Sequence, residues 1–187
     1  MKRVLSCGAV ALMISLVSGS DLAAQGKVSG FLAAGPTQTS GDLKDADSTL
    51  SGFMVQGGME YKLTSSIWLR GDASMGWNDR VTNFGEDAYI WTFAVRGEYW
   101  LPFLNTDKLR PYVLAGIGTM LYKRNPGETG LEDTEAFMTK NYLMYSAGAG
   151  LDYQLGGTSL FLEGRYDMGA DNRGLIPLVF GARWGAR

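Results

Sequence analysis

Residues 89–101 read YIWTFAVRGEYWL and decide the fold class, because their side chains sort by parity. The odd-numbered positions are apolar, aromatic or glycine, whereas Arg96 and Glu98 both fall on even-numbered positions. Successive side chains of a β-strand point to opposite faces, so one face of this segment carries charge and the other carries none. The segment is longer than the roughly 9–11 residues that a tilted strand needs to cross a bilayer. It therefore predicts a transmembrane β-strand.

The same alternation recurs along the chain after residue 26. The other segments of this kind are 27–37, 50–63, 67–78, 109–122, 141–155, 158–168 and 175–184. In each of them one face is free of charge, and the ionisable side chains collect on the other: Lys27, Glu60, Lys62, Arg70, Asp72, Arg96, Glu98, Arg110, Asp152, Glu163, Arg165, Asp167 and Arg183. A barrel in lipid needs this sorting of lipid-facing from lumen-facing residues. We expect an all-β fold, an eight-stranded antiparallel up-and-down transmembrane β-barrel.

The connections between these segments alternate in length. Residues 39–49, 80–88, 123–140 and 169–174 form the longer connections, and residues 64–66, 102–108 and 156–157 form the shorter ones. Outer-membrane barrels have short periplasmic turns and longer external loops. Both ends of the chain are therefore expected on the periplasmic side.

The N-terminal segment consists of a positively charged start, an apolar run and a possible cleavage site, in that order. Lys2 and Arg3 precede the apolar run 4–17, and small or polar residues lead to Ala24 and Gln25. This order is typical of a Sec-type secretory signal peptide, and the run is shorter than the about 20 apolar residues of a membrane-spanning helix. We expect a signal peptide at 1–25, cleaved near Ala24 or Gln25, and an outer-membrane β-barrel domain at 26–187.

The composition excludes several kinds of chemistry. The chain has no His and a single Cys, Cys7, which lies in the expected signal peptide. The mature chain then has neither a disulfide nor the usual zinc ligands, and a net charge of −2 argues against nucleic acid as a partner. No catalytic residue, cofactor or metal ligand is predicted. The acidic loop residues lack EF-hand spacing and are expected to be solvated, with bridging divalent ions as the alternative: Asp42, Asp45, Asp47, Glu128, Glu132, Asp133 and Glu135.

The charged face supplies the candidate site. Seven of its residues are candidates for a structural ion-pair network in the lumen: Arg70, Asp72, Arg96, Glu98, Glu163, Arg165 and Arg183. One register across the 80–88 loop would place Arg70 opposite Glu98 and Asp72 opposite Arg96. The alternatives are an ion or proton path and catalytic carboxylates, around which no nucleophile or base constellation is recognisable. Four inward glycines are expected to accommodate large residues of the opposite wall: Gly116, Gly118, Gly148 and Gly150.

The uncharged face carries aromatic residues near both expected membrane boundaries. On the periplasmic side these are Tyr61, Tyr99, Tyr153 and Trp184, and nearer the outside they are Trp77, Tyr89, Trp91 and Tyr145. Two such belts are typical of transmembrane barrels, where the rings sit at the level of the headgroups. The interpretation is membrane anchoring and not ligand binding.

Two stretches resemble the OmpA- and OmpX-like family of small outer-membrane barrels. Residues 110–118, RPYVLAGIG, are similar to that family's Pro-Tyr-x-x-x-Gly-x-Gly strand, and residues 147–153 with 160–166 are similar to its paired penultimate strands with Glu-x-Arg-Tyr. Residues 178–184 resemble the closing strand, which usually ends in an aromatic residue that helps the assembly machinery recognise its client. Here the terminal aromatic is replaced by Arg187 or displaced to Trp184.

The resemblance implies a non-enzymatic integral protein of the bacterial outer membrane that serves envelope integrity or surface contact. The partners it implies are outer-membrane lipid and, during biogenesis, the barrel-assembly machinery, and no surface partner can be named. Alternatives are a narrow, porin-like channel or small-ligand carrier, and a soluble lipocalin-like binding barrel, which needs an apolar lumen. A lipid-modifying enzyme on a similar barrel is a further alternative, but the small-barrel acyltransferases and deacylases depend on histidine, which is absent here.

Overall fold

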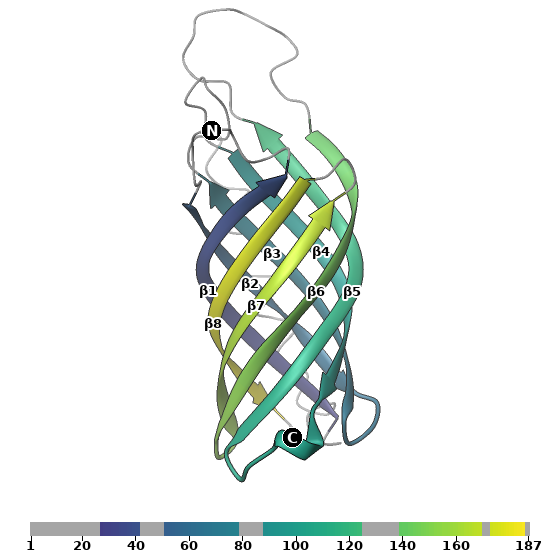
Figure 1. Ribbon diagram of the computed structural model, residues 1–187, viewed down its shortest axis with the longest axis vertical. Coiled ribbons are helices and arrows are strands. Elements are labelled where there is room, and N and C mark those ends of the chain that lie inside the picture. The colour runs from purple at the N-terminus through teal and green to yellow at the C-terminus, as the bar shows by residue number, and fades with distance from the viewer. Residues whose placement is uncertain (1–26, 42–50, 79–87, 125–138, 170–172, 186–187) are drawn as a thin grey trace, which may run out of the picture.

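The computed structural model describes residues 27–41, 51–78, 88–124, 139–169 and 173–185 (Figure 1). They form one closed antiparallel barrel of eight strands, in which each strand pairs with its neighbours in the sequence. The last strand pairs with the first and closes the cylinder. The predicted eight-stranded up-and-down architecture is therefore confirmed.

The strand bounds lie close to the predicted segments. The strands are β1 Val28–Gly41, β2 Ser51–Lys62, β3 Ile67–Asn78, β4 Ala88–Trp100, β5 Leu109–Arg124, β6 Thr139–Leu155, β7 Thr158–Gly169 and β8 Arg173–Gly185. Four of them, β1, β5, β6 and β8, extend two to four residues beyond the prediction, always at the same end of the barrel. The added residues of β1 are Gln38, Thr39, Ser40 and Gly41. Apolar alternation has stopped there although the hydrogen-bonded ladder continues.

The three short connections lie together at one end, which we call the turn end. They comprise residues 63–66, residues 101–108 with the short 3-10 helix η2 Pro102–Leu104, and the pair 156–157. In the first turn Thr64 Oγ1 accepts hydrogen bonds from the backbone N–H groups of Ser66 and Ile67, at 3.2 and 3.0 Å. Gly156 has φ +70°, which suits a two-residue hairpin turn. The other four connections, at the opposite, loop end, are residues 42–50, 79–87, 125–138 and 170–172; they fall outside the described residues, as do residues 1–26 with the expected signal peptide. Because β7 ends at Gly169 and β8 begins at Arg173, the prediction of a longer connection at 169–174 is wrong.

Burial alternates along each strand as the parity of the sequence predicts. In β4 the side chains of Arg96 and Glu98 are buried, whereas Phe93, Val95 and Tyr99 are 46, 54 and 44% exposed. Apolar side chains thus cover the outer wall, and the buried charged side chains lie in the lumen, whereas a soluble lipocalin-like barrel has an apolar lumen and a wetter exterior. No helix among the described residues is long and apolar enough to span a membrane.

The lumen is divided into layers along its axis. Toward the loop end lies an apolar layer made of Met54, Ile90, Ala94, Met120, Tyr142, Met144 and Leu175. Toward the turn end lies an aromatic layer made of Trp68, Trp100, Tyr112 and Leu114. Along β4 the order from the loop end is Ile90, Ala94, Arg96, Glu98, Trp100, so the charged residues are held between these two layers.

Candidate functional site

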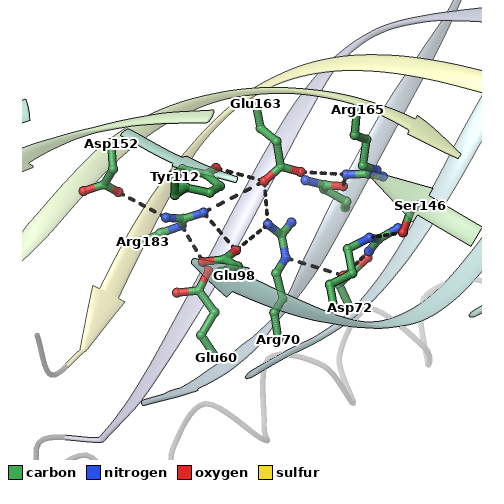
Figure 2. A network of polar contacts seen from close by, with 12 residues as sticks. Glu60, Arg70, Asp72, Glu98, Tyr112, Ser146, Asp152, Glu163, Arg165 and Arg183 are labelled. Atoms are coloured by element: carbon green, nitrogen blue, oxygen red, sulfur yellow. Dashed lines mark hydrogen bonds and ion pairs between the residues drawn. The ribbon is translucent and has the colours of Figure 1, made fainter. Parts of the chain in front are cut away.

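The charged layer of the lumen is the candidate site. Among the described residues it contains four buried arginines, Arg70, Arg96, Arg165 and Arg183, and six buried carboxylates, Glu60, Asp72, Glu98, Asp152, Glu163 and Asp167. Strands β2, β3, β4, β6, β7 and β8 contribute to it, and Figure 2 shows the side chains converging on the barrel axis. A charge removed from water is tolerated only when it is paired and hydrogen-bonded, so the partners of each group decide whether this layer is stable.

Arg183 on β8 contacts four carboxylates. Its Nε lies 3.0 Å from Glu60 Oε1, and its Nη2 lies 3.3 Å from Glu98 Oε1. Its Nη1 lies 3.4 Å from Asp152 Oδ2, and its Nη2 is 3.9 Å from Glu163 Oε2. All five side chains have no exposed surface, and Figure 2 shows the guanidinium between them. This arginine is the common counter-ion of carboxylates from four strands.

Aromatic rings complete the surroundings of Arg183. The guanidinium carbon lies 4.3 Å from the ring centroid of Phe161 and 4.5 Å from that of Tyr112. A desolvated cation over a ring face gains electrostatic stabilisation. The Tyr112 hydroxyl donates a hydrogen bond of 2.9 Å to Glu163 Oε2, which ties the aromatic layer to the charged layer.

Arg70 on β3 occupies the centre of the network. Its Nη1 lies 2.6 Å from Glu163 Oε2 and 3.0 Å from Glu98 Oε1, and its Nε lies 3.4 Å from Asp72 Oδ2. The guanidinium carbon is 4.0 Å from the ring centroid of Phe31 on β1. Glu98 and Glu163 therefore both contact Arg70 and Arg183.

Toward the loop end, Arg96 and Arg165 extend the network. Arg96 donates to Asp72, lies 3.3 Å from Asp167 Oδ1 through Nη2, and donates from Nε to Ser146 Oγ at 2.9 Å. Arg165 lies 2.8 Å from Asp167 Oδ2 through Nε. Arg165 also contacts Glu163 Oε1, at 2.9 Å, and donates to Gln56. The ion pairs thus form one continuous network.

The network has more carboxylates than guanidinium groups, six against four among the described residues. Each arginine contacts at least two carboxylates, and Arg183 contacts four. The arginines are therefore shared counter-ions, and removal of one leaves several buried carboxylates short of positive charge.

The register predicted across β3 and β4 is wrong by two residues. Arg70 lies directly opposite Arg96, and Glu98 lies opposite Trp68. The predicted acid–base pairs nevertheless form along the diagonal, because long side chains reach neighbours two positions along the facing strand. A shift of two residues keeps every side chain on the same face, so parity alone cannot distinguish the two registers.

A family model described as "Outer membrane protein beta-barrel domain" matches residues 9–167. The chain belongs to this family. As an outer membrane protein beta-barrel domain, it is located in the bacterial outer membrane, with lipid against its apolar outer wall. A search among curated proteins finds no match.

Solved structures agree with the family. Neisserial surface protein A superposes with a TM-score of 0.67 at 14% identity, over 84% of this chain and 96% of that one. Ail, the attachment invasion locus protein of Yersinia pestis, has a TM-score of 0.56 at 14% identity, over 85% and 97%. A major outer membrane protein from Thermus thermophilus has a TM-score of 0.50 at 13% identity, over 84% and 98%. At such identities the likeness is one of fold.

The structure also places the network members that the sequence analysis left out. Glu60, Asp152 and Asp167 were assigned to the charged face but not to the network, although each contacts an arginine. The uncharged Tyr112 and Ser146 were missed because only charge was used as the signal. Their inward parity was the signal available in the sequence.

Three charged-face residues lie outside this network. Lys27 is exposed at the turn end, and Lys62 and Arg110 are half-buried there. Lys62 and Arg110 border a cavity of about 490 Å³ whose lining includes Trp68 and Trp100. These cations therefore lie on the turn-end side of the aromatic layer, at the expected periplasmic mouth.

The aromatic residues assigned to the outer wall all lie there. Tyr61, Tyr99, Tyr145, Tyr153 and Trp77 are exposed, and Tyr89, Trp91 and Trp184 are half-buried. Tyr61, Tyr99, Tyr153 and Trp184 lie within a few residues of the turn end of their strands, and Trp77 lies opposite Tyr89 near the loop end. Their anchoring role stays a prediction.

Three of the four inward glycines lie beside large side chains of an adjacent strand, and not of the opposite wall as expected, whereas Gly118 lies beside Ala94. Gly150 lies opposite Tyr112 in the ladder, and a Cβ built at Gly150 would collide with the tyrosine ring. Gly116 stands in the same relation to Arg96. The same holds for Gly148 and Arg165. Because glycine has no side chain, the large side chain on the adjacent strand can lie flat against the inner surface of the barrel.

Replacement of Gly150 by alanine is expected to lower the free energy of unfolding by about 1–3 kcal/mol, because overpacking displaces the Tyr112 ring. The matched control is Gly71→Ala on the outer wall, where nothing lies within 4 Å of an added Cβ. Alanine there should be neutral or stabilising by up to about 1 kcal/mol, since it restricts the unfolded chain. Urea unfolding in lipid vesicles, followed by tryptophan fluorescence, measures both, and equal effects would contradict the packing argument.

Proposed function

We propose that this outer-membrane barrel is a non-enzymatic protein with a closed lumen, whose role is structural, in envelope integrity, or in surface contact. The observation that carries the proposal is the layered filling of the lumen by buried side chains. An eight-stranded barrel has an interior just wide enough for its own side chains. Such an interior fixes the shape of the cylinder and leaves little space for a passing solute.

Two features support a lumen that does not conduct. The ion-pair network is held between the apolar layer around Met54 and Met144 and the aromatic layer around Trp68 and Trp100. The charged side chains have no exposed surface. An ion path needs polar groups that reach water at both ends, and these two layers interrupt such a path within the described part of the chain.

The state of the carboxylates supports the absence of catalysis in the lumen. Glu60, Glu98 and Glu163 each bind a guanidinium and are buried. A general acid or base must reach the proton that it transfers on a substrate. The chain contains no histidine, and the described residues include no cluster of acidic, His or Cys side chains fit to hold a metal ion.

The remaining parts of the proposal concern segments and partners beyond the barrel wall. The external loops, with the acidic residues 42–47 and 128–135, lie outside the described residues and are proposed to face the medium as the surface for contact. The barrel-assembly machinery is a proposed partner during biogenesis, with β8 and its aromatic Trp184 as the element recognised. Cleavage of a signal peptide at 1–25 remains a prediction.

The acidic excess of the network favours one alternative, a narrow cation-conducting channel. Planar-bilayer recording of the purified barrel separates the two functions. No stepwise conductance is expected, with a porin purified in the same detergent as the positive control. Stepwise currents that fall in the Glu98→Gln variant would contradict the closed lumen and favour the channel.

A second experiment tests the absence of enzymatic activity. Incubation of the purified barrel with outer-membrane lipids should leave the mass spectrum of the lipids unchanged, and released fatty acid would contradict the non-enzymatic assignment.

A further inference from the structure

Strand β8 lacks two ladder pairs with each of its neighbours, β1 and β7, at nearly the same level along the barrel axis. Between β8 and β1 the residues Gly35 and Pro36 have no partner, and between β8 and β7 the residues Arg165 and Tyr166 have none. Pro36 on β1 and Pro177 on β8 lack the N–H group that a ladder requires. Both ladders resume in the same register beyond the gap, so the wall stays closed across it.

A groove of about 870 Å³ lies over this part of the wall. It crosses β1, β8, β7 and β6, which lie side by side on the face turned to the viewer in Figure 1. Its shallow part is lined by Ala147 and Gly164, whose outward positions carry little or no side chain. Larger outward side chains flank it: Tyr166, Ile176 and Leu178, which are 39, 41 and 49% exposed.

The exposed polar groups of this groove occur at one end, whereas Thr37 and Arg165, which also belong to its lining, are only 2 and 3% exposed. Gln38 lines it and is exposed, two positions nearer the loop end than Pro36. Beside it, Ser40 Oγ donates a hydrogen bond of 3.3 Å to the Tyr166 hydroxyl. The groove is thus amphipathic, with its apolar part in the wall and its hydrogen-bonding groups toward the loop end, the expected external side.

We propose that this groove binds one acyl chain of a glycolipid of the external leaflet. The wall faces hydrocarbon in the outer membrane, so the occupant must be apolar, and a groove left unfilled would lose dispersion contacts along its lining. A linear acyl chain matches the shape of the groove, which is shallow along Ala147 and Gly164 and flanked by larger side chains. The carbonyl that links the chain to its headgroup accepts a hydrogen bond from the Gln38 amide or the Tyr166 hydroxyl.

Gly164→Leu is the variant that fills the groove. A Cβ at Gly164 meets only Leu178 Cδ1, at 3.6 Å, so the larger residue fits without a backbone clash. The control is Gly71→Leu on β3, also outward and with nothing within 4 Å of its Cβ, but away from the groove. A shift in gel mobility between boiled and unboiled samples verifies that each variant forms the closed barrel.

Native mass spectrometry of the detergent-purified barrel titrated with lipid A, and in a second arm with phosphatidylethanolamine, tests the proposal. Wild type and Gly71→Leu are expected to retain one lipid A, and Gly164→Leu to bind it about tenfold more weakly, equivalent to about 1.4 kcal/mol. Gln38→Leu should weaken lipid A binding while leaving the fold intact. Equal loss in Gly164→Leu and Gly71→Leu, no retained lipid A in wild type, or equal retention of phosphatidylethanolamine would each overturn the assignment.

Discussion

Arg183→Met is expected to lower the free energy of unfolding by about 3–5 kcal/mol, the cost of breaking a buried ion pair on one side only. Methionine keeps much of the volume between the rings of Tyr112 and Phe161 but removes the charge. Four carboxylates lose a shared counter-ion. The measurement is reversible urea unfolding in lipid vesicles, followed by tryptophan fluorescence and by gel mobility of unboiled samples.

Glu98→Gln is the matched control for this substitution, because it removes a charge of opposite sign from the same contact. The network already has more carboxylates than arginines, and Glu98 shares both Arg70 and Arg183 with Glu163. Loss of one negative charge therefore leaves every arginine with a carboxylate partner. We expect its effect to be smaller than that of Arg183→Met by at least about 2 kcal/mol. Equal losses for the two variants would show that packing, and not charge balance, holds the layer together.

A second large effect is expected on the outer wall, where Val95→Arg should cost about 2–4 kcal/mol. Val95 lies near the middle of β4 and is 54% exposed. An arginine there is placed at the level of the acyl chains, far from both headgroup layers. The variant should also fold in lower yield, which is measured by the fraction that migrates as the unboiled barrel after insertion into vesicles.

Leu63→Arg provides the control for depth. Leu63 is also 54% exposed, but it lies in the turn after β2 at the end of the barrel. Near the interface the same substitution costs about 0–1 kcal/mol, because the side chain reaches water. Equal costs at the two positions would contradict the placement of β4 across the membrane.

The fold could be predicted from the sequence because a lipid-facing wall imposes parity on every strand. The charge-free odd positions of residues 89–101 already separate Arg96 and Glu98 from Phe93 and Val95, and burial follows that separation. The strand ends could not be predicted as well. From Gln38 to Gly41 strand β1 continues with polar residues and glycine, so its pairing goes on without the alternation of apolar and polar residues from which the strand was predicted.

The candidate site could be predicted in composition but not in geometry. Parity placed the arginines and carboxylates in the lumen, yet the register across β3 and β4 depends on loop and side-chain packing that parity does not report. The apolar layer was also missed, because Met54 and Met144 alternate with apolar or aromatic outward residues and give no contrast in the sequence. Likewise, the glycine beside Tyr112 became interpretable only once Gly150 was placed opposite it.

The pairing of β1 with β8 has a consequence for how the molecule is made. These strands are separated by nearly the whole chain, whereas every other pair of neighbours is joined by a single connection. Contacts between distant parts of a chain form slowly, because the entropy of closing the intervening loop is lost before the contact is gained. Until β1 and β8 pair, the sheet has two open edge strands that can pair with other chains. We therefore expect the first and last strands to pair in the final step of assembly.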